Sequence, residues 1–229
     1  PQLPGIPGIE DFAGRIFHSS RWDYEYTGGD SHGGLEKLGD KRVGVVGTGA
    51  TGLQVIPEVA KYAGHLTVFQ RTPTAVNVRD NGPTDREWFE SLPEGWQRQR
   101  ETTFNQIANG ENVECPVEDG WARFFYTLID AVERLPEEKR TDLEAVMAAQ
   151  EQADFGYNEL LRERVDETVR DAEKAALLKA YYRTLCKRPG FSDDYLPAFD
   201  QDNVTLVDVS TGIERINADG VEVDGVLVL

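Results

Sequence analysis

The sequence has 229 residues, of which 24 are basic and 41 are acidic, so its formal net charge is −17 at pH 7. With 39% hydrophobic residues and 22 glycines, the composition is that of an ordinary globular chain and excludes disordered and fibrous classes. Apolar runs are far shorter than the roughly 20 residues that a membrane-spanning helix needs. Most of the negative charge falls after residue 110, and such a field repels nucleic acid and anionic membranes, so neither is expected as a partner.

The two cysteines, Cys115 and Cys186, cannot build a disulfide framework, and no charged-then-apolar leader opens the chain. A reducing compartment, the cytoplasm, is therefore the expected location. We expect Cys186 to be buried, which is the commoner state of a free cysteine. The three histidines lie far apart without ligand spacing, so we expect no metal site.

The first part of the chain predicts a linker followed by a βαβ unit. Residues 1–11 hold prolines and glycines that indicate an extended linker. Residues 41–46 predict a buried strand, and residues 50 to 62 predict a helix that Pro57 should kink or end early. Residues 66–70 predict a second strand, so the two strands should be parallel.

From about residue 83 to residue 183 the pattern becomes helical. Two apolar stripes with helical spacing predict two amphipathic helices with core-facing sides. The first stripe consists of Trp121, Phe124, Phe125, Leu128, Ile129 and Val132. The second consists of Leu161, Val165, Val169, Ala172 and Ala176. Pro189 is expected to stop the last helix of this insert.

The end of the chain returns to strands. Residues 203–209 alternate as a strand does, and residues 213–223 form a hairpin pattern around Asp219-Gly220. Residues 226–229 indicate the beginning of another strand. Together these elements predict an α/β fold, a Rossmann-like parallel sheet that carries a helical insert and a β-hairpin.

A glycine-rich segment lies between the first predicted strand and helix, which is the context that makes its motif credible. Its residues fit the pattern G-x-G-x-x-G and are Gly47, Thr48, Gly49, Ala50, Thr51 and Gly52. The first glycine permits the tight turn, the second lets the backbone approach a pyrophosphate, and the third lets the helix pack closely. The alternative is a glycine turn that binds nothing.

The end of the second strand selects the cofactor. An NAD site places an acidic residue about 20 residues after the glycines, to hold the ribose 2′-hydroxyl. The sequence has Gln70-Arg71-Thr72 there instead, and an arginine suits a 2′-phosphate. We therefore predict NADP(H), with Arg71 as a solvated strand end as the alternative.

A segment before the glycine loop resembles a known family. Phe12, Gly14, His18, Trp22 and Asp23 fit F-x-G-x-x-x-H-x-x-x-W-[P/D], the fingerprint of Baeyer–Villiger monooxygenases. Residues 68–73, Cys186-Lys187-Arg188-Pro189 and the stretch from Tyr195 to Asp208 are similar to the same family. Related flavin-containing and N-hydroxylating monooxygenases usually lack the Trp-Pro/Asp ending.

The resemblance implies roles for individual residues. Arg71, Thr72 and Lys187 would hold the adenosine 2′-phosphate. Arg188 would be the catalytic residue, reaching the flavin and stabilising the negative charge that develops after its reaction with O₂. His18 and Trp22 would be structural or coupling residues. From the residues alone, Lys187-Arg188 would instead be a cation pair at a helix C-terminus.

The resemblance also implies an activity and a domain organisation. Residues 1–229 would be the NADP(H)-binding domain, with a linker and the fingerprint in residues 1–40, and the FAD domain would lie outside this chain. The parent enzyme would use NADPH, FAD and O₂ to insert an oxygen next to a ketone carbonyl, giving an ester or lactone. The alternatives are an N-hydroxylating or S-oxidising flavin monooxygenase, or an isolated NADP-binding module without turnover.

Overall fold

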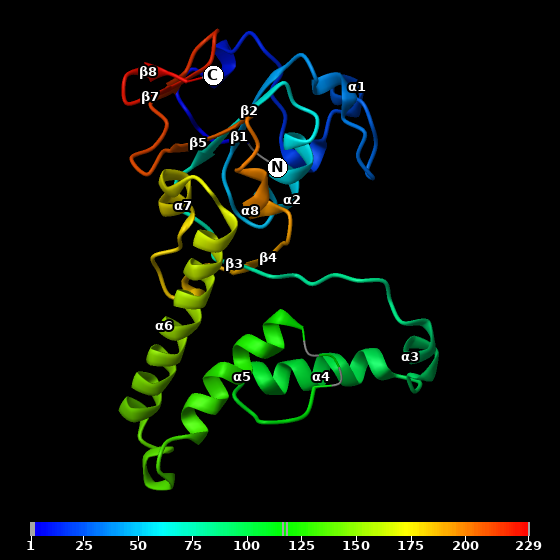
Figure 1. Ribbon diagram of the computed structural model, residues 1–229, viewed down its shortest axis with the longest axis vertical. Helices are drawn as coiled ribbons and strands as arrows, with labels where there is room; N and C mark the ends of the chain where they lie inside the picture. Colours follow the sequence, from blue (N-terminus) through cyan, green and yellow to red (C-terminus); the bar gives the residue numbers. More distant parts are fainter. Residues whose placement is uncertain (1–2, 116, 118, 229) are drawn as a thin grey trace.

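The computed structural model describes residues 3–115, 117 and 119–228, and its central feature is a three-stranded parallel sheet. The strands lie in the order β1 (Arg42–Val46), β2 (His65–Gln70) and β5 (Val204–Asp208) (Figure 1). Helix α2 (Gly52–Ala60) connects β1 to β2, so the predicted βαβ unit is confirmed. The predicted α/β fold class, with its parallel sheet, is confirmed as well.

Alternation along β2 and β5 places different layers on the two faces of the sheet. On one face, Leu66 and Val204 are paired neighbours in a core that includes α2 and α8 (Tyr195–Ala198). On the other face, Phe69 packs with residues of the C-terminal hairpin. The sheet is therefore covered by helices on one side and by the hairpin on the other.

The C-terminal hairpin is antiparallel, as its sequence predicts. Its two arms are β6 (Arg215–Ile216) and β7 (Val221–Val223), and β8 (Val226–Leu227) pairs with β7 as a third strand. The end of the last predicted strand, Leu229, lies outside the described residues. The Ile216 backbone N–H donates to the Pro7 carbonyl at 2.8 Å, so the N-terminal segment lies against this hairpin.

The helical insert leaves the sheet and returns to it through a short parallel pair of strands. These are β3 (Val76–Asn77) and β4 (Gly190–Phe191), which the sequence did not predict. Between them lie α3 (Arg86–Ser91), α4 (Trp96–Ala108), α5 (Gly120–Glu133), α6 (Leu143–Thr168) and α7 (Ala172–Leu178). Figure 1 shows α6 running away from the sheet, with α5 beside it and α3 at the far end of the insert.

Aspartates fix where the insert helices begin. The side chains of Asp85, Asp119, Asp142 and Asp171 accept backbone N–H groups in the first turns of α3, α5, α6 and α7. Such caps satisfy donors that have no partner inside the helix. The remaining short elements are α1 (Tyr24–Thr27) and 3₁₀ turns at Ile9–Asp11, Ser19–Arg21, Glu36–Leu38, Glu137–Lys139 and Thr184–Cys186.

Two predictions about strands and linkers are wrong in part. Strand β1 is an edge strand of the described sheet rather than a buried one, and Val46 is 51% exposed. The hairpin covers Phe69, but it leaves the paired Val46 open. The N-terminal segment is not extended throughout, because residues 9–11 form a 3₁₀ turn whose Ile9 packs against the hairpin core.

The second apolar stripe does not lie on a single helix. Helix α6 ends at Thr168 because Val169 adopts extended backbone, and Asp171 then caps α7. The new helix presents Ala175 to the core, so the predicted core residues Ala172 and Ala176 are exposed. In the first stripe, Phe124 and Ile129 are buried, and the other members are partly buried.

Pro57 lies inside α2, and the helix ends three residues later, at Ala60. Two other predictions about single residues are wrong. Pro189 does not stop the last insert helix, which ends earlier, at Leu178. Cys186 is exposed rather than buried, because it lies at the end of the 3₁₀ turn at Thr184–Cys186, whereas Cys115 is buried.

Candidate functional site

A cavity of about 420 Å³ lies at the carboxyl ends of the parallel strands. Six of the predicted cofactor residues line it: Gly47, Thr48, Gly49, Arg71, Thr72 and Lys187. The other lining residues are Ile6, Val46, Phe69, Thr74, Val209, Gly212 and Ile213. In open α/β sheets this edge is where ligands bind, so the cavity is the candidate functional site.

The glycine loop is fastened to the segment that follows β2. The Gly47 N–H donates to the Phe69 carbonyl at 3.0 Å, and the buried Thr48 hydroxyl donates to the Thr72 carbonyl at 3.1 Å. The Thr74 hydroxyl donates in return to the Thr48 carbonyl. These bonds hold the two strand-end loops side by side, so both contribute to one cavity.

The three motif glycines differ in what a side chain would meet. Gly47 has φ +101°, a backbone conformation that favours glycine, so it makes the turn. A Cβ on Gly52 would lie 2.7 Å from the Gly47 carbonyl oxygen, so this glycine allows α2 to pack under the loop. A Cβ on Gly49 would meet no described atom within 4 Å, and the cavity lies in front of it.

Lys187 reaches the cavity from the segment after the helical insert. Its Nζ lies 5.3 Å from the centre of the Tyr182 ring, a cation–π contact. The Tyr182 hydroxyl donates to the Pro73 carbonyl at 2.8 Å, which ties the ring to the loop after β2. Burial raises the pKa of Tyr182, so the phenol stays neutral and remains a donor at physiological pH. Arg71 and Lys187 therefore give this side of the cavity two positive charges.

Four predicted site residues lie outside the cavity lining. Ala50 and Thr51 are exposed at the start of α2, and Gly52 is buried beneath the loop. Arg188 is exposed next to Lys187 but does not line the cavity. Lys187 has extended backbone, with φ −137° and ψ 150°, and neighbouring side chains in extended backbone point in opposite directions. This explains why only one of the two cations faces the cavity.

The five fingerprint residues also lie outside the cavity lining, and their contacts are structural. Phe12 packs against the hairpin core, and Trp22 against the helix-covered core. The Trp22 indole N–H donates to the Thr27 hydroxyl at 3.0 Å. His18 accepts the Ser20 backbone N–H through its Nδ1 and so caps the 3₁₀ turn at Ser19–Arg21.

Asp23 fixes the start of α1. Its carboxylate accepts the Tyr26 backbone N–H at 3.1 Å and is bound by Arg15 on the other side, with Nε at 2.9 Å. The Arg15 hydrogen bond holds the pKa of Asp23 below its usual range, so the carboxylate remains an acceptor at neutral pH. The fingerprint ending Trp22-Asp23 thus shapes a short helix.

Replacement of Gly14 by alanine tests this structural interpretation of the fingerprint. The added Cβ would lie 2.4 Å from Cε1 of the Phe12 ring, so the ring must move out of its packing. We expect a loss of about 1–2 kcal/mol in the free energy of unfolding, by overpacking, measured by denaturant unfolding. Adding Phe12→Leu should recover part of the loss, and a Gly14→Ala variant as stable as wild type would contradict the contact.

Several lining residues were missed by the sequence analysis. Val209, Gly212 and Ile213 follow β5, and Thr74 follows β2. The rule that ligands bind at the carboxyl ends of parallel strands could have found them, because β5 was predicted and its following loop had to reach the same edge. Ile6 carried no sequence signal, since it reaches the cavity from the linker, and neither did Tyr182, which does not line the cavity but contacts Lys187 from the segment after α7.

Comparison with known proteins gives relatives along nearly the whole chain, although no family model matches. The chain is 52% identical over 226 residues to a Baeyer–Villiger monooxygenase of Streptomyces coelicolor, covering 97% of this chain and 37% of the relative. The chain is homologous to Baeyer–Villiger monooxygenases. It spans little more than a third of the length of the curated relatives that it matches.

Solved structures agree with this relationship. A polycyclic ketone monooxygenase of Thermothelomyces thermophila superposes with a TM-score of 0.85 at 40% identity, covering 99% of this chain and 37% of that one. The protein OTEMO, solved as a complex with FAD and NADP, has a TM-score of 0.67 at 26% identity, and the match covers 99% of this chain and 42% of that one. The α/β architecture is therefore shared with part of each of these two proteins.

No described helix combines the length and the apolar character that crossing a membrane requires. Among the same residues, no group of three or more histidine, cysteine, aspartate or glutamate side chains is placed to hold a metal ion.

Proposed function

We propose that this chain binds NADP(H) in the cavity at the strand ends, as the NADP(H)-binding domain of an FAD-dependent Baeyer–Villiger monooxygenase. The observation that carries the proposal is the meeting of the glycine loop, Arg71 and Lys187 around one cavity. A relative solved as a complex with FAD and NADP supports it.

The two sides of the cavity suit the two parts of a dinucleotide. The glycine loop and the N-terminus of α2 would receive the pyrophosphate, because helix N-termini favour anions. Arg71, Thr72 and Lys187 would hold the 2′-phosphate, with the guanidinium available for bidentate contact. Ile6, Val209 and Ile213 form an apolar wall that a ring could contact.

The whole protein would insert one oxygen of O₂ next to a ketone carbonyl, giving an ester or lactone. The flavin, bound mainly by parts of the protein beyond this chain, would supply the redox chemistry. This chain would hold the nicotinamide cofactor and present Arg188, whose exposed guanidinium is always charged. Product analysis with a ketone, an amine and a sulfide tests this reaction class, and hydrogen peroxide alone from ketones would contradict it.

Arg71→Ala tests the choice of cofactor. In calorimetric titrations of the full-length protein, we expect the variant to bind NADP⁺ about tenfold to a hundredfold more weakly, because a charge-assisted contact to the 2′-phosphate is lost. Binding of NAD⁺, which has no 2′-phosphate, should hardly change. Arg79→Ala is the matched control, since Arg79 is exposed and does not line the cavity.

Two other outcomes of this titration would contradict separate parts of the proposal. Equal affinity of the wild-type protein for NADP⁺ and NAD⁺ would overturn the role of Arg71 and leave the glycine loop intact. Binding of neither nucleotide to the folded full-length protein would overturn the cavity as a dinucleotide site.

A further inference from the structure

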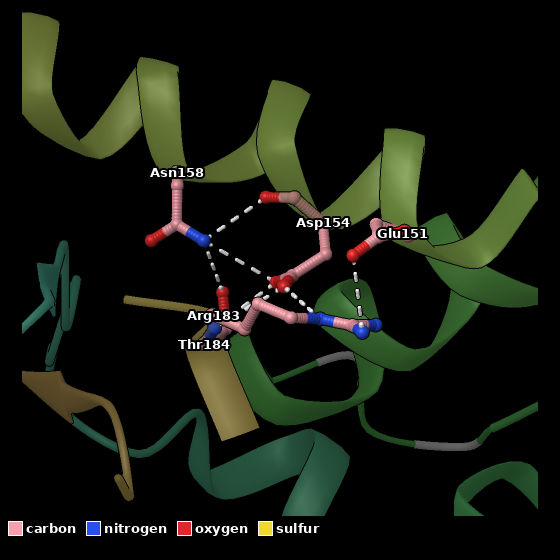
Figure 2. A network of polar contacts seen from close by, with 5 residues as sticks. All are labelled: Glu151, Asp154, Asn158, Arg183 and Thr184. Atoms are coloured by element: carbon pink, nitrogen blue, oxygen red, sulfur yellow. Dashed lines mark hydrogen bonds and ion pairs between the residues drawn. The ribbon is translucent and has the colours of Figure 1, made fainter. Parts of the chain in front are cut away.

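A buried polar network links helix α6 to the segment that carries Lys187 (Figure 2). Asp154, on α6, is only 4% exposed, and its carboxylate accepts the Thr184 backbone N–H at 3.2 and 3.3 Å. The Asn158 side-chain amide, one turn further along, donates to the Thr184 hydroxyl at 2.9 Å and to Asp154 at 3.3 Å. Thr184 is fully buried between them.

Arg183 closes the network toward solvent. Its guanidinium pairs with Asp154 at 3.4 Å and with Glu151 at 3.4 Å, and Figure 2 shows it lying between these two carboxylates. The Asn158 side-chain oxygen is buried without a hydrogen-bond partner in the part of the chain that the structure describes. A buried polar network that is only partly satisfied is a poor source of stability compared with apolar packing. What it provides here is a fixed position for Thr184.

The segment from Thr184 to Gly190 is fixed at both ends. At its start, Thr184 is held by α6, and at its end the Gly190 N–H donates to the Ala75 carbonyl at 2.8 Å in the β3–β4 pair. A Cβ on Gly190 would lie 2.2 Å from a Leu53 side-chain carbon, so the chain passes close against α2. Lys187 lies between these two anchors, three residues after Thr184.

The two faces of this segment line different cavities. Lys187 lines the cavity at the strand ends. Arg183, Leu185 and Cys186 line a second cavity of about 340 Å³ together with Asp154 and residues of α5 and α6. A loss of the Asp154 contact would therefore free the segment to move between the two spaces, and Lys187 would lose its place beside the glycine loop.

We propose that Asp154 is a positioning residue for the cofactor: by holding Thr184, it places Lys187 where the 2′-phosphate binds. The helical insert thereby takes part in selecting NADP(H) over NAD(H). This inference rests on the proposed function, since it assumes that Lys187 meets the 2′-phosphate.

Asp154→Asn tests the inference in the full-length protein. It replaces one of the two oxygens that accept from the Thr184 N–H and the Arg183 guanidinium by an amide NH₂, which cannot accept, with little change in volume. Glu159→Gln is the matched control, an exposed α6 carboxylate that pairs only with Arg162 among the described ion pairs. We expect Asp154→Asn to weaken NADP⁺ binding about tenfold, with a change of less than about twofold for NAD⁺. General damage to the fold would weaken both nucleotides alike.

A double-mutant cycle tests whether the effect passes through Lys187. In a Lys187→Ala background, Asp154→Asn should cost no more than about twofold in NADP⁺ affinity, because the group that it positions is absent. The alkylation rate of Cys186, followed by peptide mass spectrometry, reports the order of the segment without any nucleotide. It should rise in Asp154→Asn and stay at the wild-type rate in Glu159→Gln.

The outcomes separate this inference from the proposed function. Wild-type NADP⁺ affinity in Asp154→Asn, or a full additional loss in the Lys187→Ala background, would overturn the positioning role. If the wild-type protein does not prefer NADP⁺ over NAD⁺, both the proposed function and the cofactor role of Asp154 are wrong. In that case the Cys186 alkylation rate still decides whether Asp154 orders the segment.

Discussion

Replacing Gly49 with alanine is expected to weaken NADP⁺ binding about a hundredfold without loss of folding stability, because two or more charge-assisted contacts to the pyrophosphate would be lost. The position has room in the protein itself, since no described atom lies within 4 Å of an added Cβ, and its φ is not positive. The new methyl group would instead occupy the space through which the backbone approaches the anion. Calorimetric titration and thermal unfolding of the full-length protein measure the two quantities.

Gly52→Ala is the comparison variant, because there the added Cβ strains the protein itself. Its Cβ would lie 2.7 Å from the Gly47 carbonyl oxygen, a backbone atom that cannot move without changing the turn. This variant should lose stability by about 1–3 kcal/mol, in addition to nucleotide affinity. If Gly49→Ala bound NADP⁺ as tightly as wild type, the pyrophosphate would not lie against the glycine loop.

The βαβ unit could be predicted from sequence because its signals are local. A β-branched run, a glycine turn and a second apolar run follow one another within the span from Arg42 to Gln70. Each of these runs determines its own secondary structure without distant partners. The glycine loop and Arg71 then come together simply because parallel strands end at the same edge. The hairpin around Asp219-Gly220 was predictable for the same reason.

The wrong predictions concern features that depend on distant partners. The exposure of Val46 depends on how far the hairpin reaches across the sheet. The sequence of β1, the strand that carries Val46, does not encode that reach. The break after Thr168 depends on Asp171 as a cap, and Arg170 there binds Asp200 from a loop 30 residues away. Apolar periodicity continued through the break, so the spacing alone suggested one helix.

The network around Asp154 lay beyond sequence analysis for a related reason. Asp154 and Asn158 have the spacing of one helix face, but polar residues at that spacing usually face solvent. Only the return of the chain at Thr184 buries them. Polar residues buried by contacts between distant segments are therefore the part of the site that needs the structure.

Lys187 and Arg188 are adjacent, yet we expect their alanine variants to lose different functions: NADP⁺ binding in Lys187→Ala and ester formation in Arg188→Ala. Of the two, only Lys187 lines the cavity at the strand ends, whereas Arg188 is exposed and does not line it. Arg188→Ala should therefore bind NADP⁺ and oxidise NADPH within a few-fold of wild type, while ester formation falls about a hundredfold. The lost guanidinium would have stabilised the negative charge that develops when the reduced flavin reacts with O₂, so hydrogen peroxide should replace the ester.

Lys187→Ala should show the reverse behaviour: weak NADP⁺ binding, with ester formed for each NADPH consumed in nearly the wild-type ratio. Arg188→Lys should recover only part of the ester, because an ammonium keeps the charge but loses the planar set of donors. The measurement is the ratio of ester to NADPH consumed, with peroxide determined in parallel. Equal loss of ester per NADPH in both alanine variants would contradict these separate roles of Lys187 and Arg188, because it would mean that the two cations act on the same bound group.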